Sequence, residues 1–364
     1  MIAPACHDRL RTEPRREFWH GMSVCVLGGT GFLGSHLIER LLHHGARVRD
    51  LSLLPSDRRA IRHPGMEYRV GDVRNAGDVR GAVAGARVVF LAAGSVAIGR
   101  TARSALDAHR DGVRRVLDAL PADTRLVLTS SVVAVGATRS HRTLDESAKF
   151  TLDRLNVGYV HAKRAAEVEA LSAAANGRDV VIVNPGYLFG PGDPGPSVMG
   201  RYCLRVWRGN VPFVAKGGIN AVDVRDVAEG HLLAAEHGLS GRRYILGGEN
   251  LTHRELAVAL ARAAGRRRHF PRIPQWLFAG LAAACEVHGR IVGKEPFPSL
   301  ETARVGRLYW HFSSDRAKHE LGYRPRPFRE TAADAFAWHQ AHTRVTPRGL
   351  NRWLFPTTPV RTTV

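Results

Sequence analysis

The chain contains the stretch Val24-Cys25-Val26-Leu27-Gly28-Gly29-Thr30-Gly31-Phe32-Leu33-Gly34. An apolar strand runs into spaced glycines, which fit either Gly28-x-x-Gly31-x-x-Gly34 or Gly29-x-Gly31-x-x-Gly34, and then into a segment of helical period. A pyrophosphate can lie against the backbone only where no Cβ intrudes, so Gly28 and Gly31 permit the turn and Gly34 lets the helix pack closely. The free N–H groups of Phe32 and Leu33 at the helix N-terminus would face the anion. The stretch predicts a dinucleotide-binding turn, and a glycine-rich hairpin without function is the alternative.

The composition is that of a globular protein with an unusual charge. The 364 residues are 44% hydrophobic and 24% charged, enough for one large α/β domain or two domains. The formal net charge is +20, and most of the cations are arginines spread along the whole chain. The densest run, Arg266-Arg267-Arg268, has no interleaved aromatic residues on which bases could stack. We therefore expect no nucleic-acid binding.

Cysteines and apolar runs indicate neither a metal site nor a membrane span. The four cysteines are far apart and form no Cys-x-x-Cys pair. Residues 1–21 are basic and polar and do not read as a signal peptide, so a cytoplasmic protein is expected. The apolar stretch 276–285 is shorter than the roughly 20 residues that span a bilayer. It predicts a buried or cleft-lining helix, with a helix at a membrane interface as the alternative, and we expect no stable membrane insertion.

Strand-like and helix-like segments alternate along the chain. Apolar runs predict strands at residues 24–27, 48–51, 68–70, 88–92, 126–129, 180–183 and 244–246. Segments of helical period lie between them, at residues 32–43, 78–83, 102–120, 159–175 and 224–236. This order predicts an α/β fold of the Rossmann type, a doubly wound parallel sheet that binds ligands at the carboxyl ends of its strands.

The predicted organisation has a main domain and two tails. A tail over residues 1–21 precedes a domain over 22–342, and a second tail covers 343–364. Residues 22–185 and 221–249 are expected to bind the cofactor. Beyond residue 190 prolines and glycines interrupt the pattern, so residues 186–220 and 250–342 are expected to form a smaller substrate lobe.

Three residues are candidates for catalysis. Ser131 follows the strand at 126–129, at the edge where a nicotinamide would lie. Tyr159 and Lys163 have the i, i+4 spacing that places two side chains on one helix face. A free tyrosine has a pKa of about 10, and a nearby ammonium is expected to lower it, which suits a general acid or base. Lys163 could also bind ribose hydroxyls, and Ser131 could hold the substrate oxygen. A solvated helix face is the alternative for the Tyr-x-x-x-Lys pair.

These residues resemble those of the extended short-chain dehydrogenase/reductase family, also called the NAD-dependent epimerase/dehydratase family. The resemblance spans about residues 23–340, and its nearest branch is dihydroflavonol-reductase-like and hopanoid-associated epimerase-like. It rests on the glycine turn and on Gly71-Asp72-Val73, Leu91-Ala92-Ala93, Thr129-Ser130-Ser131, Tyr159-x-x-x-Lys163, Asn184-Pro185-Gly186, Gly190-Pro191-Gly192 and Val222-Asp223-Val224-Arg225-Asp226-Val227-Ala228.

The resemblance implies a sheet of about seven strands with a small C-terminal substrate lobe. It also implies that Ser131, Tyr159 and Lys163 are catalytic and that the protein is a homodimer through the helices at 102–120 and 159–175. The remaining implied cofactor contacts are Asp72 and Val73 at the adenine, Ala92 and Ala93 along the cofactor, and Pro185 and Tyr187 near the nicotinamide. For Asp72, a turn or helix-capping role is the alternative.

Two departures from the family pattern put the proton relay in doubt. Phe90 stands where relatives often have His, and His109 stands where many have an Asn that helps to hold an active-site water or the helix backbone. His109 could replace that Asn, but we favour a packing role.

The choice between NADP and NAD depends on the end of the second strand. Asp50 has the NAD-like distance from the glycines but is expected to lie within the strand. Ser52 and Leu53 occupy the selecting positions, and Arg58 follows in the next loop. A small residue with a basic neighbour favours NADP over NAD; surface arginines without a role are the alternative.

The predicted function is NAD(P)-dependent reduction of a carbonyl or oxidation of a secondary alcohol, by hydride transfer with Tyr159 as the general acid or base. Apolar residues of the substrate lobe favour a small, ring-containing or isoprenoid-like substrate, and they are Tyr202, Trp207, Phe213, Trp276, Leu277, Phe278, Tyr309 and Trp310. One alternative is an NAD-dependent epimerase or dehydratase acting on a sugar or nucleotide sugar. The other is a non-catalytic NAD(P)-binding regulatory protein.

Overall fold

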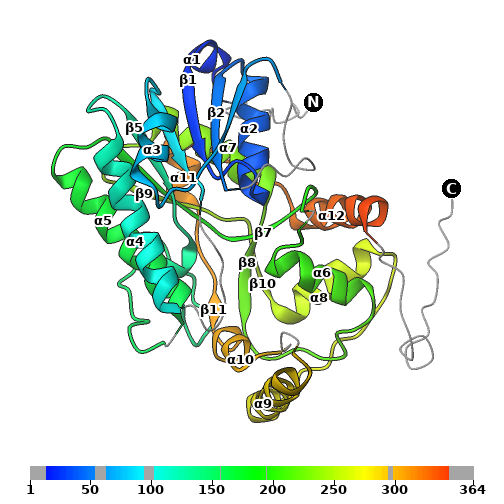
Figure 1. Cartoon of the computed structure of the whole chain (residues 1–364). Coiled ribbons are helices and arrows are strands. Elements are labelled where there is room, and N and C mark those ends of the chain that lie inside the picture. The colour runs from blue at the N-terminus through cyan, green and yellow to red at the C-terminus, as the bar shows by residue number, and fades with distance from the viewer. Residues whose placement is uncertain are drawn as a thin grey trace, which may run out of the picture.

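The computed structural model describes residues 14–53, 63–93, 102–155, 157–193, 195–293 and 298–343, with residues 102–110 as backbone alone. Its main body is a parallel sheet with the strand order β3-β2-β1-β4-β5-β6-β9 (Figure 1). The seven strands are β1 (Ser23–Leu27), β2 (Arg47–Ser52), β3 (Met66–Val70), β4 (Val88–Leu91), β5 (Arg125–Thr129), β6 (Val180–Pro185) and β9 (Arg243–Leu246). Each predicted strand coincides with one of them, so the doubly wound parallel sheet is confirmed.

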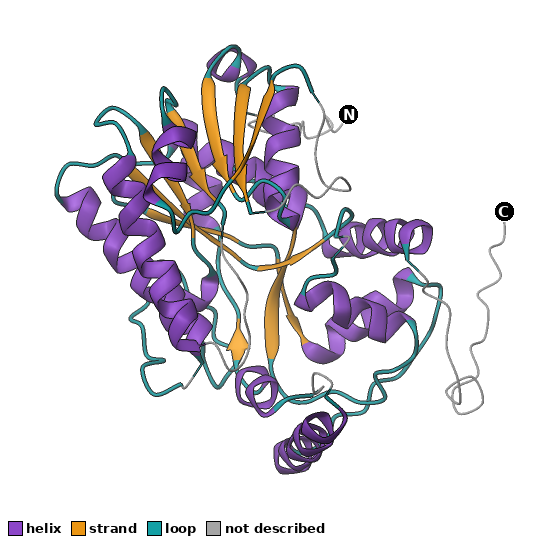
Figure 2. Ribbon diagram, viewed as in Figure 1, coloured by secondary structure: helices purple, strands orange, loops and turns teal. Residues whose placement is uncertain are grey.

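Helices cover both faces of this sheet, which is why central strands such as β1 and β6 are mostly apolar (Figure 2). The strands β2 and β3, toward one edge, also carry charged residues. Along β1, Val24 and Val26 enter one apolar cluster while Cys25 and Leu27 enter the other. The first cluster includes residues of α2 (Phe32–His43), α7 (Val224–His237) and α11 (Asp315–Leu321). The second includes residues of α3 (Ala76–Val83), α4 (Ala102–Ala119) and α5 (Gly158–Ala175). The predicted helices of the main domain are confirmed within a few residues of their ends.

A smaller lobe lies beyond the carboxyl ends of the strands (Figure 1). Its sheet has β8 at the centre, paired with β7, β10 and β11. The strands are β7 (Tyr187–Phe189), β8 (Gly218–Asp223), β10 (Glu249–Thr252) and β11 (Tyr309–Trp310). The helices of this part are α6 (Val198–Trp207), α8 (His253–Ala263), α9 (Gln275–Val292), α10 (Leu300–Gly306) and α12 (Phe328–His342). A 3-10 turn, η1 (Val132–Ala134), follows β5.

Part of the segment 1–21, which was expected to be a tail, belongs to the fold. Residues Arg16–Trp19 form the one-turn helix α1, and Trp19 is fully buried against the main sheet. Its ring lies 6.1 Å from that of Phe90, and its Nε1 donates to Glu236 of α7 at 2.6 Å. Phe90, the first departure from the family pattern, is therefore a core residue packed between Trp19 and His231.

The apolar stretch 276–285 was expected to form a buried or cleft-lining helix, and the structure does not bury it. It lies in α9, of whose residues only Ala282 and Gly289 are buried. The expectation was wrong because periodicity and apolarity do not reveal whether a helix face is covered. No helix in the described ranges combines the length and the apolarity needed to cross a membrane.

Candidate active site

The glycine turn joins β1 to α2. At two of its glycines the neighbouring backbone leaves no room for a side chain. Gly28 has a φ of 98°, and a Cβ on it would lie 2.7 Å from the backbone of Ala93. A Cβ on Gly34 would lie 2.8 Å from the Cα of Gly29. Backbone atoms cannot yield to such approaches, so Gly28 and Gly34 permit the close packing of strand, turn and helix. Ala93, an expected cofactor neighbour, lies directly against the turn.

Gly31 has a different role. Among the described residues, a Cβ on Gly31 would meet only the carbonyl oxygen of Gly28, at 3.2 Å, so these residues leave the space beside it free. Gly31 is also the N-cap of α2, and as a glycine it offers no side chain to cap the helix. The first-turn N–H groups, those of Phe32, Leu33 and Gly34, therefore have no intrahelical acceptor. Open space beside uncapped helix N–H groups fits the pyrophosphate of a dinucleotide.

Asp50 stabilises the glycine turn through hydrogen bonds. Its buried carboxylate accepts hydrogen bonds from the Gly29 amide at 2.7 Å and from the Ser52 hydroxyl at 2.9 Å. Ser52 in turn accepts from the Thr30 amide at 3.2 Å. Burial raises the pKa of Asp50 to about 6, against the lowering effect of these two donors. Asp50 and Ser52 thus shape the turn, and Leu53 beyond them is exposed. Arg58, the basic residue expected to select NADP, lies outside the described residues.

The expected adenine-side residues follow β3 and β4. Asp72 pairs with Arg74, whose Nε lies 2.8 Å from its carboxylate, and the Asp72 amide donates to Asp78 at 2.9 Å. These bonds place Asp72 in a turn, and its contact with the adenine stays a prediction. Arg74 holds the pKa of its carboxyl below the usual value. Val73 packs against the apolar cluster under α3. Ala92 continues β4, because its amide donates to Leu27.

The structure brings the three candidate catalytic residues together. Ser131 follows β5, while Tyr159 and Lys163 lie on the first turns of α5. The Ser131 side chain is hydrogen-bonded to the phenol of Tyr159. Lys163 is buried, with its Nζ 6.0 Å from the centre of the Tyr159 ring and 3.0 Å from the carbonyl oxygen of Thr129. The solvated helix face, the alternative for this pair, is therefore excluded.

The protonation states of Tyr159 and Lys163 differ from those expected. Burial raises the pKa of Tyr159 to about 12, and the Ser131 hydrogen bond lowers it by less. The direction is opposite to the expected lowering because burial outweighs the neighbouring groups, and the Lys163 ammonium donates to the Thr129 carbonyl oxygen. Burial lowers the pKa of Lys163 to about 8, and the negative charge of Glu167 opposes this. At neutral pH the site therefore holds a neutral phenol beside a mostly protonated amine.

A buried polar network behind these residues was not singled out from the sequence. Asn184, at the end of β6, donates to the Ser131 carbonyl oxygen at 2.9 Å and also to Glu167. Glu167 is fully buried on α5 one turn after Lys163, and Arg243 of β9 donates to it at 3.3 Å. A Glu four residues after the lysine was the signal available in the sequence. The network ties β6, β9 and α5 to the loop that carries Ser131.

Thr129 connects the site to the opposite helical layer. Its hydroxyl lies 2.9 Å from Nε2 of His231 on α7, while its carbonyl oxygen binds Lys163. His231 is fully buried, and burial lowers its pKa to about 4, so the ring is neutral at pH 7. His109 was the second departure from the family pattern, and its side chain lies outside the described part.

Pro185 and Tyr187 stand where β6 passes into β7, beside the site. Burial raises the pKa of Tyr187, and the neighbouring Tyr159 adds to this. Three aromatic residues expected to line the substrate site are instead core: Trp207, Tyr309 and Trp310. Trp276 and Leu277 are exposed on α9. The partly buried side chains that share the apolar cluster of Tyr159 include Leu155, Tyr187, Met199 and Tyr202.

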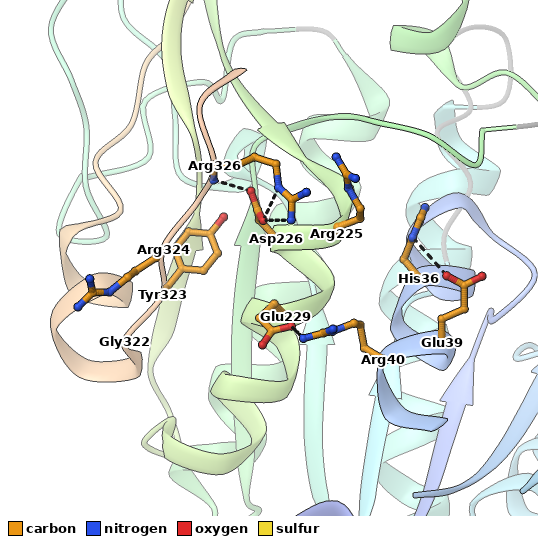
Figure 3. A pocket seen from close by; sticks show the side chains of 10 residues that line it. All are labelled: His36, Glu39, Arg40, Arg225, Asp226, Glu229, Gly322, Tyr323, Arg324 and Arg326. Carbon is orange, nitrogen blue, oxygen red and sulfur yellow. Dashed lines mark hydrogen bonds and ion pairs between the residues drawn. The ribbon is translucent and has the colours of Figure 1, made fainter. Parts of the chain in front are cut away.

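A polar hollow of about 370 Å³ lies between α2, α7 and the segment after α11, and it is not this site (Figure 3). Its cations and carboxylates pair with each other. Arg40 pairs with Glu229, and Arg326 pairs with Asp226 at 2.8 Å. The hollow is thus a junction at which ion pairs hold the C-terminal segment to the main domain.

Comparison with known proteins agrees with the geometry. Residues 24–247 match the model of the NAD-dependent epimerase/dehydratase family. The chain belongs to this family, and it is an NAD(P)-binding enzyme of the extended short-chain dehydrogenase/reductase type. The family and fold expected from the sequence are confirmed.

Individual relatives cover most of the chain. A Synechocystis protein described provisionally as a dihydroflavonol 4-reductase is 33% identical over 89% of this chain and 97% of its own length. "Sterol demethylase protein B" of Methylococcus capsulatus is 32% identical over 87% of this chain and 98% of its own length. The crystal structure of gox2253 has a TM-score of 0.78 at 33% identity and covers 88% of this chain and 99% of that one.

Proposed function

We propose that this enzyme interconverts a carbonyl and a secondary alcohol on a small apolar, ring-containing or isoprenoid-like substrate. One observation carries the proposal: Ser131, Tyr159 and Lys163 meet at the carboxyl end of β5. Only β4 separates β5 from β1, which leads into the glycine turn. A proton donor and a dinucleotide site thus share one edge of the sheet.

The residues of this chain would supply the proton and the orientation. NAD(P)H, when bound, supplies the hydride to the carbonyl carbon. Tyr159, a neutral phenol at pH 7, donates its proton to the carbonyl oxygen, so C=O becomes CH–OH. The Ser131 hydroxyl hydrogen-bonds to the carbonyl oxygen and keeps it next to the phenol of Tyr159. Lys163 provides the positive charge that stabilises the resulting phenolate. In the oxidation direction, Tyr159 would take the proton back.

The residues at the end of β2 support NADP as the cofactor. In dinucleotide sites that select NAD, a carboxylate at this place accepts the ribose hydroxyls. Here the Asp50 carboxylate is buried and already binds Gly29 and Ser52. It is therefore a poor acceptor for ribose, and Arg58 remains the candidate partner of a 2′-phosphate.

Two observations support an apolar substrate. Tyr187, Met199 and Tyr202 are partly buried members of the apolar cluster to which Tyr159 also belongs. Relatives at 32% and 28% identity are named a sterol demethylase protein and a 3-beta-hydroxysteroid dehydrogenase. The homodimer through α4 and α5 and the lack of nucleic-acid binding remain predictions.

The decisive experiment identifies the nucleotide that co-purifies with the protein and measures the turnover of added cofactor and substrate. Protein purified without added cofactor is denatured, and the released nucleotide is identified. Fresh protein is then given NADPH or NADH with a panel of ketones, sterol-like ketones and nucleotide sugars. We expect net NADPH oxidation with an apolar ketone. Tightly held NAD without net NADPH oxidation would instead indicate an epimerase or dehydratase, and binding without turnover of any compound would indicate a regulatory protein.

Two tyrosine variants distinguish loss of the proton donor from a non-specific effect of removing a tyrosine hydroxyl. Tyr159→Phe should lower kcat by about 10²–10⁴-fold while nucleotide binding persists. Tyr323→Phe is the control, because the Tyr323 hydroxyl is buried in the apolar cluster of α2 and α7 and has no hydrogen-bond partner among the described residues. Full turnover by Tyr159→Phe would remove the proposed proton donor.

A further inference from the structure

Helix α9 exposes mostly apolar residues, unlike an ordinary surface helix. Two of its polar side chains face the protein: Gln275 donates to the Ala303 carbonyl oxygen at 3.0 Å, and Glu286 accepts from the Leu300 amide at 3.0 Å. His288 and Arg290 are its exposed polar residues. The residues turned to solvent are mostly apolar. Figure 1 shows the helix at the lower edge of the smaller lobe, next to α10.

The exposed face is continuous along the helix. One stripe at helical spacing is formed by Trp276, Gly280, Ala284, Val287 and Ile291. Leu277, Leu281 and Val292 lie beside it. Trp276 is 75% exposed, Val287 is 57% exposed and Ile291 is 78% exposed. Six of the ten large hydrophobic residues that are exposed in the described part of the chain lie on this one helix. A soluble surface does not normally keep such a patch in water.

Exposed cations lie on this helix and on its neighbour. Arg290 is exposed on α9, where it also pairs with Glu286 at 3.8 Å, and Arg304 and Arg307 are exposed on or just after α10. The acidic residues of these two helices are only partly exposed, and Glu286 is bonded to both the Leu300 amide and Arg290. The chain as a whole has a formal net charge of +20. An apolar face with basic neighbours is complementary to an anionic lipid surface.

From this arrangement we propose that α9 is a peripheral docking helix, which lies in the interface of an anionic bilayer with Trp276, Val287 and Ile291 among the acyl chains. The 18-residue helix would lie along the surface, since none of the described helices is fit to span a membrane. A second copy of the chain fits this face less well, because a two-fold contact would oppose the same arginines. The docking does not depend on the proposed reaction.

The test is co-sedimentation of the full chain with vesicles. We expect binding to vesicles of phosphatidylglycerol and phosphatidylcholine, little binding to phosphatidylcholine alone, and weaker binding at high salt. Charge alone could produce this pattern, so the key variant keeps the charge. Val287→Ser with Ile291→Ser should weaken partitioning about tenfold or more. Arg290→Gln should weaken it less.

The matched control is Val70→Ser with Leu239→Ser. These two residues are 59% and 54% exposed and lie outside α9 and the predicted dimer helices α4 and α5. This control should bind vesicles like the parent chain. Equal vesicle binding by the parent and the Val287/Ile291 variant would overturn the proposal. So would a parent dimer that becomes monomeric in this variant on size exclusion with light scattering, since α9 would then be a contact between copies.

Discussion

Lys163 donates a hydrogen bond from Nζ to the carbonyl oxygen of Thr129 across 3.0 Å. This bond fixes the ammonium at the carboxyl end of β5, whereas the hydroxyl of the same threonine binds His231 in the opposite layer. The cation of the site is therefore held by the sheet and not by the tyrosine one turn before it. Its protonation depends on burial and on Glu167.

Glu167→Gln should move the alkaline limit of activity to lower pH, if the proposed reaction is correct. The negative charge of Glu167 raises the pKa of Lys163, which burial lowers to about 8. Without that charge the amine loses its proton at a lower pH, so kcat should fall earlier as pH rises. The pH profile of kcat measures this shift.

The control for that variant is Glu169→Gln. Glu169 lies on the same helix but pairs with Arg114 of α4, so its loss should leave the profile unchanged. A Glu167→Gln profile identical to that of the parent would show that Glu167 has no influence on the proton of Lys163.

Gly31→Ala and Gly28→Ala should separate ligand binding from folding. A Cβ on Gly31 meets only one atom of the described residues, at 3.2 Å, so Gly31→Ala should change the free energy of unfolding by less than about 1 kcal/mol. It should nevertheless weaken nucleotide binding about tenfold or more, because the methyl group occupies the pyrophosphate space. Gly28→Ala, with a φ of 98° and Ala93 at 2.7 Å, should unfold far more easily. Denaturant titration and calorimetric binding of NADPH check both. Unchanged affinity in Gly31→Ala would place the pyrophosphate elsewhere.

Asp50→Asn should raise stability at pH 8 by about 2 kcal/mol. The pKa of Asp50 is raised from 3.8 to about 6, so its stabilising contribution is present at low pH and is lost as pH rises through about 6. An amide avoids the cost of burying the charge and can still accept from Gly29. The advantage of the variant should shrink toward pH 4 in denaturant titrations.

Asp72→Asn is the matched control, and its effect on stability near neutral pH should have the opposite sign to that of Asp50→Asn. Arg74 lowers the pKa of Asp72, so its contribution to stability is present near neutral pH and is lost as pH falls through its folded pKa. A stability curve for Asp50→Asn parallel to that of the parent at every pH would contradict the raised pKa.

Trp19→Ala should destabilise the domain by about 3–5 kcal/mol. Trp19 is fully buried, packs on Phe90 and donates to Glu236. Trp276→Ala removes the same side chain from a position that is 75% exposed and should change the free energy of unfolding little. Equal effects of the two substitutions in thermal unfolding would show that α1 is not part of the core.

Much of the main domain could be predicted because its signals are local. Strands buried on both faces must be apolar throughout, as Val24–Leu27 are, and helices such as Phe32–His43 show their period directly. Tyr159 and Lys163 are four residues apart on one helix, so their common face follows from the helix repeat. The smaller lobe has short strands and proline breaks, which leave no comparable period.

The sequence by itself determined the alternating sheet, the glycine turn and the identity of the catalytic candidates, because each depends on neighbours within one or two helical turns. Only the tertiary structure decided that Asp50 binds Gly29 and that Glu167, Asn184 and Arg243 meet behind Ser131. It also decided which face of α9 is left uncovered. Such contacts join residues distant in the chain, and side-chain type alone does not state which groups folding brings together or whether a polar group is buried.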